Sequence, residues 1–291
     1  MSAHRRAVLL MLASAAFFTT NVLLVRALGT IGSASVWLIT AARFAVGLGL
    51  VLAFYRREFR PRHLFTNWKL ADRGLFGGVS VFFGYLAVVN LGAGRATFIT
   101  NTYVIWGALW AAVVLHEKLR PTVLVGGVTA LTGLALLTGV LTTGASPGIY
   151  DLVALTAALM SARVIVTIRQ LHGTEHTATI FGALCFYGLL LCLGPAVATF
   201  APLPPAAWVV LLGASLAAGF AQLAMTRAYR DLPVGEGSLI QTLVPLGIAV
   251  GGVVFFRERF TAAELIGAGL ILAGTLFTAL RKEAKPLPAE D

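Results

Sequence analysis

Two arginines stand inside long apolar stretches of this sequence, where a charged side chain is costly and usually functional. Arg43 lies near the centre of the stretch 35–54, and Arg163 lies within the stretch 150–169. Insertion scales put such a charge at about 2.5–3.5 kcal/mol at the bilayer centre. The guanidinium fork of Arg43 could hold a carboxylate; alternatively, it pairs with helix-end carbonyls or fixes packing. Arg163 lies nearer a helix end and could also snorkel to the membrane surface.

Amide and aromatic side chains repeat at helical spacing and could line a cavity. Amides need several hydrogen-bond partners, so Asn101, Gln222 and Gln241 either line a polar path or join helices. Aromatic rings would suit a planar substrate through offset stacking, although most of them are expected in the core or at the membrane interface. The candidate substrate-binding residues are Asn21, Arg43, Tyr85, Asn101, Tyr103, Trp106, Arg163, Gln222 and Gln241.

Residues for other kinds of chemistry do not gather at membrane depth. Every Asp and Glu stands in an expected loop, in a tail or near the end of an apolar stretch, and all five His stand at the edges or outside. We therefore expect no catalytic residues, no cofactor, no metal site and no proton carrier within the membrane. The sequence has no Walker A loop, which excludes an ATP-driven pump within this chain. Cys185 and Cys192 are expected to be small core residues.

The composition explains why these polar residues are so few. Of 291 residues, 58% are hydrophobic and 12% are charged, and the mean hydropathy is +0.87. Ordinary soluble domains carry about 25% charged residues. This excludes a soluble globular enzyme, a disordered chain and a disulfide-rich secreted module. The net charge of +10 would otherwise suggest nucleic acid, but in a membrane protein it arises from cytoplasmic loops, so we expect no nucleic-acid partner.

Ten apolar stretches are long enough to cross the hydrocarbon core of a bilayer, which takes about 20 residues. None shows the alternating pattern of a lipid-facing strand, so helices are favoured over a barrel. The sequence therefore predicts an all-α integral membrane protein with ten transmembrane helices. The stretches are roughly 7–28, 35–54, 72–91, 95–115, 121–140, 150–169, 178–199, 207–228, 236–256 and 262–280.

The basic residues predict the orientation of these helices. With a cytoplasmic N-terminus, sixteen Lys and Arg fall in cytoplasmic segments, four fall on the opposite side, and Arg43 and Arg163 remain inside helices. Basic loops stay on the cytoplasmic side, so both termini are expected there.

The two halves of the chain are weakly similar to each other. His116-Glu117-Lys118-Leu119 corresponds to Arg257-Glu258-Arg259-Phe260, and the same offset of 141 places Gly126 on Gly267 and Gly133 on Gly274. Five helices per half is an odd number, so the halves cross the membrane in opposite directions. We expect a first repeat over residues 1–145, a second over residues 146–281 and a cytoplasmic tail over residues 282–291. Inverted repeats of this kind favour a secondary transporter whose substrate site lies near the midplane.

Ten helices in two repeats, each with a Glu after its fourth helix and a glycine-bearing fifth helix, resemble the drug/metabolite transporter superfamily. The chain is most similar to EamA-type exporters and, within them, to bacterial aromatic amino acid exporters of the YddG type. Pro245 also fits that pattern, whereas His116-Glu117 and Arg257-Glu258 replace the usual Gly-Glu. The resemblance implies a protein of the bacterial inner membrane that moves amphipathic metabolites outward.

The resulting hypothesis is a monomeric alternating-access exporter of aromatic or other neutral amino acids, with the lipid bilayer as its surroundings. Pro245 is the expected hinge, since it removes a backbone hydrogen bond. The lack of a mid-membrane carboxylate predicts facilitated diffusion. Alternatives are a proton-driven multidrug exporter and a carrier of lipids or nucleotide sugars. A membrane-embedded enzyme is disfavoured because no catalytic cluster appears.

Overall fold

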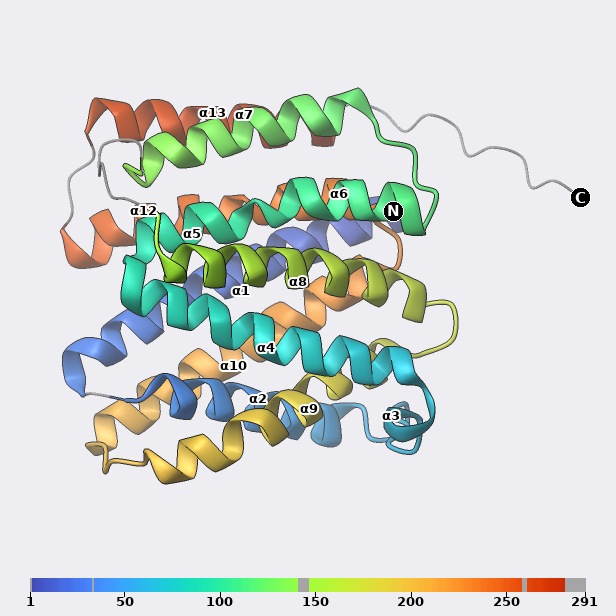
Figure 1. Cartoon of the computed structure of the whole chain (residues 1–291), viewed down its shortest axis with the longest axis vertical. Helices are drawn as coiled ribbons and strands as arrows, with labels where there is room; N and C mark the ends of the chain where they lie inside the picture. The colour runs from blue at the N-terminus through green and yellow to red at the C-terminus, as the bar shows by residue number, and fades with distance from the viewer. Residues whose placement is uncertain (1, 33, 141–146, 258–260, 281–291) are drawn as a thin grey trace, which may run out of the picture.

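The computed structural model describes residues 2–32, 34–140, 147–257 and 261–280, and within them every regular element is a helix (Figure 1). The predicted repeat boundary at residue 145, the tail from residue 282 and Glu258 lie outside these residues. The helices are α1 Ala3–Ile31, α2 Val36–Phe54, α3 His63–Thr66, α4 Trp68–Leu91, α5 Ala93–Asn101, α6 Tyr103–Val114, α7 Pro121–Leu137, α8 Ile149–Leu171, α9 Thr177–Ala198, α10 Pro205–Ala228, α11 Val234–Gln241, α12 Leu243–Phe256 and α13 Ala262–Leu280.

These helices confirm the all-α membrane fold. In the described part of the chain, eight helical segments are long and apolar enough to span a membrane, and two shorter apolar helices, Pro121–Leu137 and Ala262–Thr278, complete the ten predicted spans. Most ends agree with the expected ones within a few residues. The first helix begins earlier than predicted because Ser2 caps it, its hydroxyl accepting a hydrogen bond from the backbone N–H of Arg5 at 3.3 Å.

The fourth and ninth spans are each broken into two helices, which the hydropathy pattern did not predict. α5 ends at Asn101 and α6 begins at Tyr103, while α11 ends at Gln241 and α12 begins two residues later. In the ninth span the break has a direct cause. Pro245 has no N–H to donate to the carbonyl four residues earlier, which is that of Gln241. The spans predicted over 95–115 and 236–256 are therefore present as Arg95–Val114 and Val234–Phe256, each with a break inside it.

Helices from the two halves of the chain pack against each other throughout the molecule. α1 lies beside α10, α2 beside α9, α4 beside α8 and α7 beside α13 (Figure 1). Each of these pairs joins one helix from before residue 140 with one from after it. A space at the centre of the molecule is therefore enclosed by elements from both halves.

The α7–α13 pair depends on the glycines that the two halves share at matching positions. A Cβ at Gly133 would lie 2.5 Å from the carbonyl oxygen of Gly267, and a Cβ at Gly126 would lie 2.7 Å from that of Gly274. Only glycine leaves room for backbones this close, a packing mode common between membrane helices.

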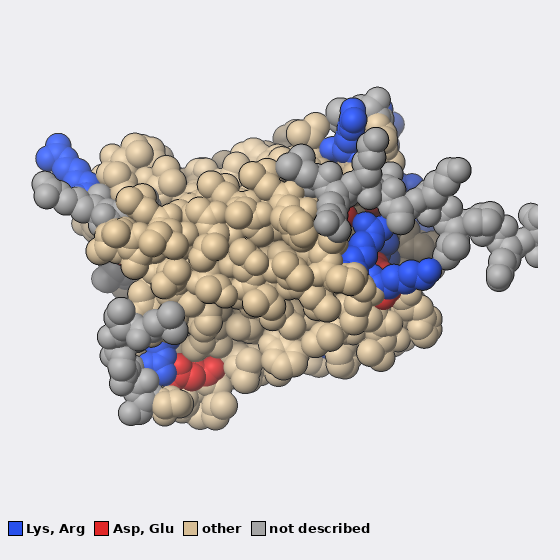
Figure 2. All heavy atoms as spheres, turned by 90° about the horizontal axis from the view of Figure 1, so that it is seen from above, with Lys and Arg blue, Asp and Glu red and all other residues tan. Residues whose placement is uncertain are grey.

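Charged side chains gather at the two ends of the molecule. Figure 2 shows Lys, Arg, Asp and Glu at either end of the visible face and a broad surface without charge between them. Large exposed apolar side chains such as Leu52, Val113 and Val209 occupy helix surfaces. An apolar belt between charged ends is the surface that a multi-pass membrane protein presents to lipid.

Candidate functional site

A cavity of about 340 Å³ lies between the two halves of the chain, beside the breaks in the fourth and ninth spans. Its walls come from α1, α2, α4, α5, α6, α8, α10, α11 and α12. The volume is in the range of small-molecule sites, which are mostly apolar with a few polar groups. Discontinuous helices at a midplane cavity are typical of substrate sites in transporters with inverted repeats.

Most of the predicted site residues border this cavity although they come from eight different helices. Asn101 and Tyr103 flank the break between α5 and α6, and Gln241 and Pro245 flank the break between α11 and α12. The predicted residues in the lining are Asn21, Arg43, Tyr85, Asn101, Tyr103, Gln222, Gln241 and Pro245.

Trp106 and Arg163 do not border the cavity. Trp106 is 40% exposed on the outside of α6, so it resembles a lipid-facing aromatic. Arg163 turns instead toward α4, where its Nη2 lies 2.7 Å from Oδ1 of Asp72 and its guanidinium stands 4.6 Å from the ring centre of Phe76. Thr167 donates a further hydrogen bond to Asp72. Arg163 was expected to reach the substrate or the membrane surface, and in the structure it joins α8 to α4.

The polar side chains of the lining differ in how many of their hydrogen-bonding groups already have partners in the protein. Nη1 of Arg43 donates to the hydroxyl of Tyr85 at 3.4 Å. Asn21 donates to a carbonyl of α10, Asn101 to the carbonyl of Thr97, and Gln241 to the hydroxyl of Ser14. The side-chain amide of Gln222 has no such partner in the described part of the chain. The side-chain amide of Gln222 and the other N–H donors of Arg43 are therefore available to hydrogen-bond a ligand.

Sequence reasoning missed Arg73, which borders the cavity from α4. It was counted among the cytoplasmic basic residues because it stands at the very start of the predicted stretch 72–91, whereas α4 begins at Trp68 and places Arg73 more than one turn inside the helix. The glycines that follow it were an available signal. A Cβ at Gly78 would lie 2.9 Å from the Cα of Gly188, so this part of α4 packs closely on α9 and Arg73 is buried completely.

Two serines of the lining were also missed. Ser80 of α4 and Ser161 of α8 are joined by a hydrogen bond of 2.6 Å, and Ser80 also donates to the carbonyl of Ala157. Single serines in membrane helices usually join helices, so the sequence alone gives no reason to select them.

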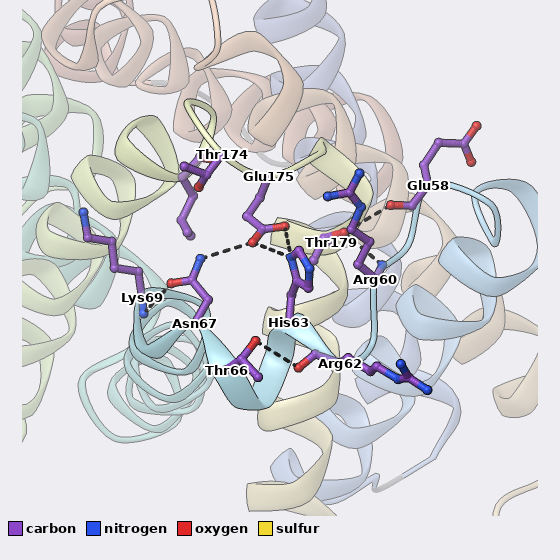
Figure 3. A network of polar contacts seen from close by, with 11 residues as sticks. Glu58, Arg60, Arg62, His63, Thr66, Asn67, Lys69, Thr174, Glu175 and Thr179 are labelled. Atoms are coloured by element: carbon purple, nitrogen blue, oxygen red, sulfur yellow. Dashed lines mark hydrogen bonds and ion pairs between the residues drawn. The ribbon is translucent and has the colours of Figure 1, made fainter.

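The loops at the end where α1 begins are tied together by a polar network (Figure 3). Glu175, in the loop between α8 and α9, lies 2.8 Å from Nδ1 of His63 and accepts a hydrogen bond from Asn67 at 3.2 Å. Thr179 of α9 donates to the backbone carbonyl of Glu58. The carboxylate of Glu175 therefore links the segment before α4 to a loop of the other half.

Glu117, from the repeated motif, forms a second link at this end. Its Oε2 accepts the backbone N–H of Val234 at 3.1 Å, which satisfies a free donor at the start of α11. Glu117 also pairs with Arg169, which donates to the carbonyls of Tyr229 and Leu232. Nearby, burial lowers the pKa of His172, and its neutral ring donates the Nε2–H to the carbonyl of Thr226.

Comparison with known proteins agrees with this architecture. The model of the EamA-like transporter family matches residues 5–139 and 148–280. The threonine/homoserine exporter RhtA of Escherichia coli K12 is 28% identical over 266 residues, covering 85% of this chain and 83% of the relative, and that of Salmonella typhimurium LT2 is 26% identical over 265 residues. A solved crystal structure superposes with a TM-score of 0.80 at 21% identity, over 94% of this chain and 98% of that one, which supports the fold.

The family match extends over nearly the whole chain, and the cavity, the broken helices and the apolar belt fit a membrane transporter for small molecules rather than an enzyme. The chain belongs to the EamA-like transporter family.

Proposed function

We propose that this protein exports aromatic or other neutral amino acids, together with related amphipathic metabolites, through the central cavity. The observation that carries the proposal is the cavity itself, about 340 Å³ in volume, in which Arg43 lies among aromatic rings and amides. The guanidinium would hold the carboxylate, and the rings and amides would contact the rest of the molecule.

Two features favour different side chains on the substrate. The relatives named threonine/homoserine exporters favour small hydroxylated amino acids. Phe18, Tyr85 and Tyr103 in the lining favour an aromatic ring, which could stack on them. Both kinds of amino acid therefore belong in the test.

The proposed mechanism is alternating access. The lining reaches Val88 near the end of α4 and Thr97 near the start of α5, so the cavity extends toward the end opposite the His63–Glu175 network. Breaking this network would let the loops separate and open the cavity to the other side. Pro245, beside the break between α11 and α12, is the proposed hinge.

We infer facilitated diffusion from the lining, because its described residues include no Asp or Glu that could carry a proton. Asp72 lies on α4 but its carboxylate is occupied by Arg163 and Thr167. By the bias of basic residues, the end with the polar network faces the cytoplasm, with both termini on that side. The proposed location is the bacterial inner membrane, and the proposed state is a monomer.

The test is uptake of radiolabelled threonine, homoserine, phenylalanine and tryptophan into proteoliposomes, with and without a pH gradient. Saturable flux of at least one amino acid, unchanged by the gradient, is the expected result. Absence of saturable flux for all four would contradict amino acid transport. Flux that requires the gradient would contradict facilitated diffusion and support the proton-driven alternative.

A further inference from the structure

Arg73 borders the cavity, and its guanidinium is buried without a full set of partners. The residue is 0% exposed, and its Nε and Nη2 atoms have no hydrogen-bond partner in the described part of the chain. Burying a charged group without partners costs several kcal/mol, and a membrane interior offers little water to compensate. An anion that entered the cavity would offset this cost by accepting the free hydrogen bonds.

Arg73 shares the cavity with a second positive charge. Arg43 borders the same space, so two side chains of like charge belong to one cavity. The described lining has no Asp or Glu, and the neighbouring Asp72 is engaged by Arg163 and Thr167. The cavity therefore holds two cations and, in the described lining, no counter-ion.

The helix that carries Arg73 leaves space for its side chain. A Cβ added at Gly77, one turn further along α4, would overlap Nη1 of Arg73. A Cβ at Gly49, on the exposed face of α2 and outside the lining, would meet no atom within 4 Å. Gly77 thus fixes where the guanidinium lies, and Gly49 offers a control position that touches neither Arg73 nor the cavity.

We propose that Arg73 and Arg43 together bind the carboxylate of the transported molecule, and that the cavity prefers organic acids with a net negative charge over zwitterions. N-acylated amino acids and other carboxylic acids without a free amine are the substrate class that this charge balance fits. The ammonium group of a zwitterion would bring a third positive charge between two unneutralised cations. An uncharged amide N–H could instead donate to the free amide of Gln222. This deepens the proposed function and rests on the cavity being the transport path.

The experiment is isothermal titration calorimetry on the purified full chain in detergent. Phenylalanine and threonine are each titrated as the free amino acid, the N-acetyl derivative and the primary amide. For at least one side chain, we expect the N-acetyl acid to bind at least threefold more tightly than the free amino acid. The amides, which lack the carboxylate, should show no measurable binding. Amides that bind as tightly as the acids, or no binding by any of the six compounds, would overturn the proposal.

Variants then assign the effect to Arg73. Arg73→Gln should weaken binding of the N-acetyl acid at least tenfold, and Arg73→Lys should restore part of the loss. Gly77→Ala should weaken binding and Gly49→Ala should not, with size-exclusion elution confirming that each variant is folded. Binding unchanged in Arg73→Gln and in Gly77→Ala would overturn the proposal.

The outcomes separate this inference from the proposed function. Amino acid flux in proteoliposomes with no dependence on Arg73 would overturn the carboxylate site and leave amino acid export intact. Arg73-dependent binding of N-acetyl acids without flux of any free amino acid would support the site and contradict export of free amino acids.

Discussion

At the scale of single residues, the polar side chains inside this membrane protein fall into two groups. One group is fully engaged by the protein: the carboxylate of Asp72 accepts hydrogen bonds from Arg163 and Thr167. The other group retains unused donors, as in Arg73 and Gln222, and these residues border the cavity. Residues whose polar groups all have protein partners therefore join helices, whereas residues with unused donors could bind a ligand. Residue type alone does not distinguish the two.

The engaged group leads to a prediction about stability. Asp72→Asn should lower the free energy of unfolding by about 1–3 kcal/mol, because it leaves Arg163 without its counter-ion. This loss is smaller than that for a fully buried ion pair, because the Arg163 side chain is 39% exposed. The measurement is the melting temperature in detergent. Asp231→Asn is the matched control, because the Arg227–Asp231 pair is exposed and 3.8 Å long and should contribute about 0–1 kcal/mol. Equal melting temperatures for the two variants would contradict the assigned role of Asp72.

At the scale of elements, the molecule is held by contacts between helices of opposite halves. The glycines of α7 and α13 allow backbone contact, and the loops at one end are linked by single carboxylates, Glu175 and Glu117. Glycine contacts cannot rearrange without losing packing, whereas a few polar links can break at modest cost. We therefore expect α7 and α13 to move as one unit and the linked loops to separate.

The α7–α13 contact can be tested on one helix. Gly267→Val should destabilise the protein by about 1–3 kcal/mol, because its side chain would collide with the backbone of α7. Gly269→Val, on the exposed face of α13, should be tolerated, since a Cβ there meets no atom within 4 Å. Melting temperatures in detergent measure both effects. Equal losses at the two positions would show that helix propensity and not backbone contact is responsible.

The loop network can be tested with a thiol that the chain already contains. Glu175→Gln weakens the link to His63 and should expose α9, so that N-ethylmaleimide labels the buried Cys185 several times faster in a Cys192→Ser background. Glu58→Gln is the control, because Glu58 takes part through its backbone carbonyl and its carboxylate points away from the network (Figure 3). Labelling that is equally slow in both variants would argue against a gate at this end.

At the scale of the whole molecule, the sequence was sufficient to predict the membrane fold, the number of spans and eight of the residues that line the cavity. Hydropathy measures how apolar a segment is, and helical spacing indicates which residues share a face of a helix. Neither indicates which face of a helix packs against which neighbouring helix. Arg73 was therefore counted among the cytoplasmic basic residues and Arg163 was assigned to the substrate, whereas close packing of α4 on α9 buries Arg73 and Asp72 engages Arg163. Pro245 predicted a hinge in the ninth span, but hydropathy gave no sign that the helix ends at Gln241, because an apolar window remains apolar across the break.

The account as a whole depends on one claim, that the substrate crosses the membrane through the central cavity. The direct measurement is the initial rate of saturable amino acid flux into proteoliposomes containing Gly84→Trp, whose indole would extend into the cavity where a Cβ meets no other atom within 4 Å. Gly49→Trp on the exposed face of α2 adds the same bulk outside the lining and is the control. The account predicts that Gly84→Trp loses nearly all flux while Gly49→Trp retains the wild-type rate. Wild-type flux with an unchanged KM in Gly84→Trp would contradict it.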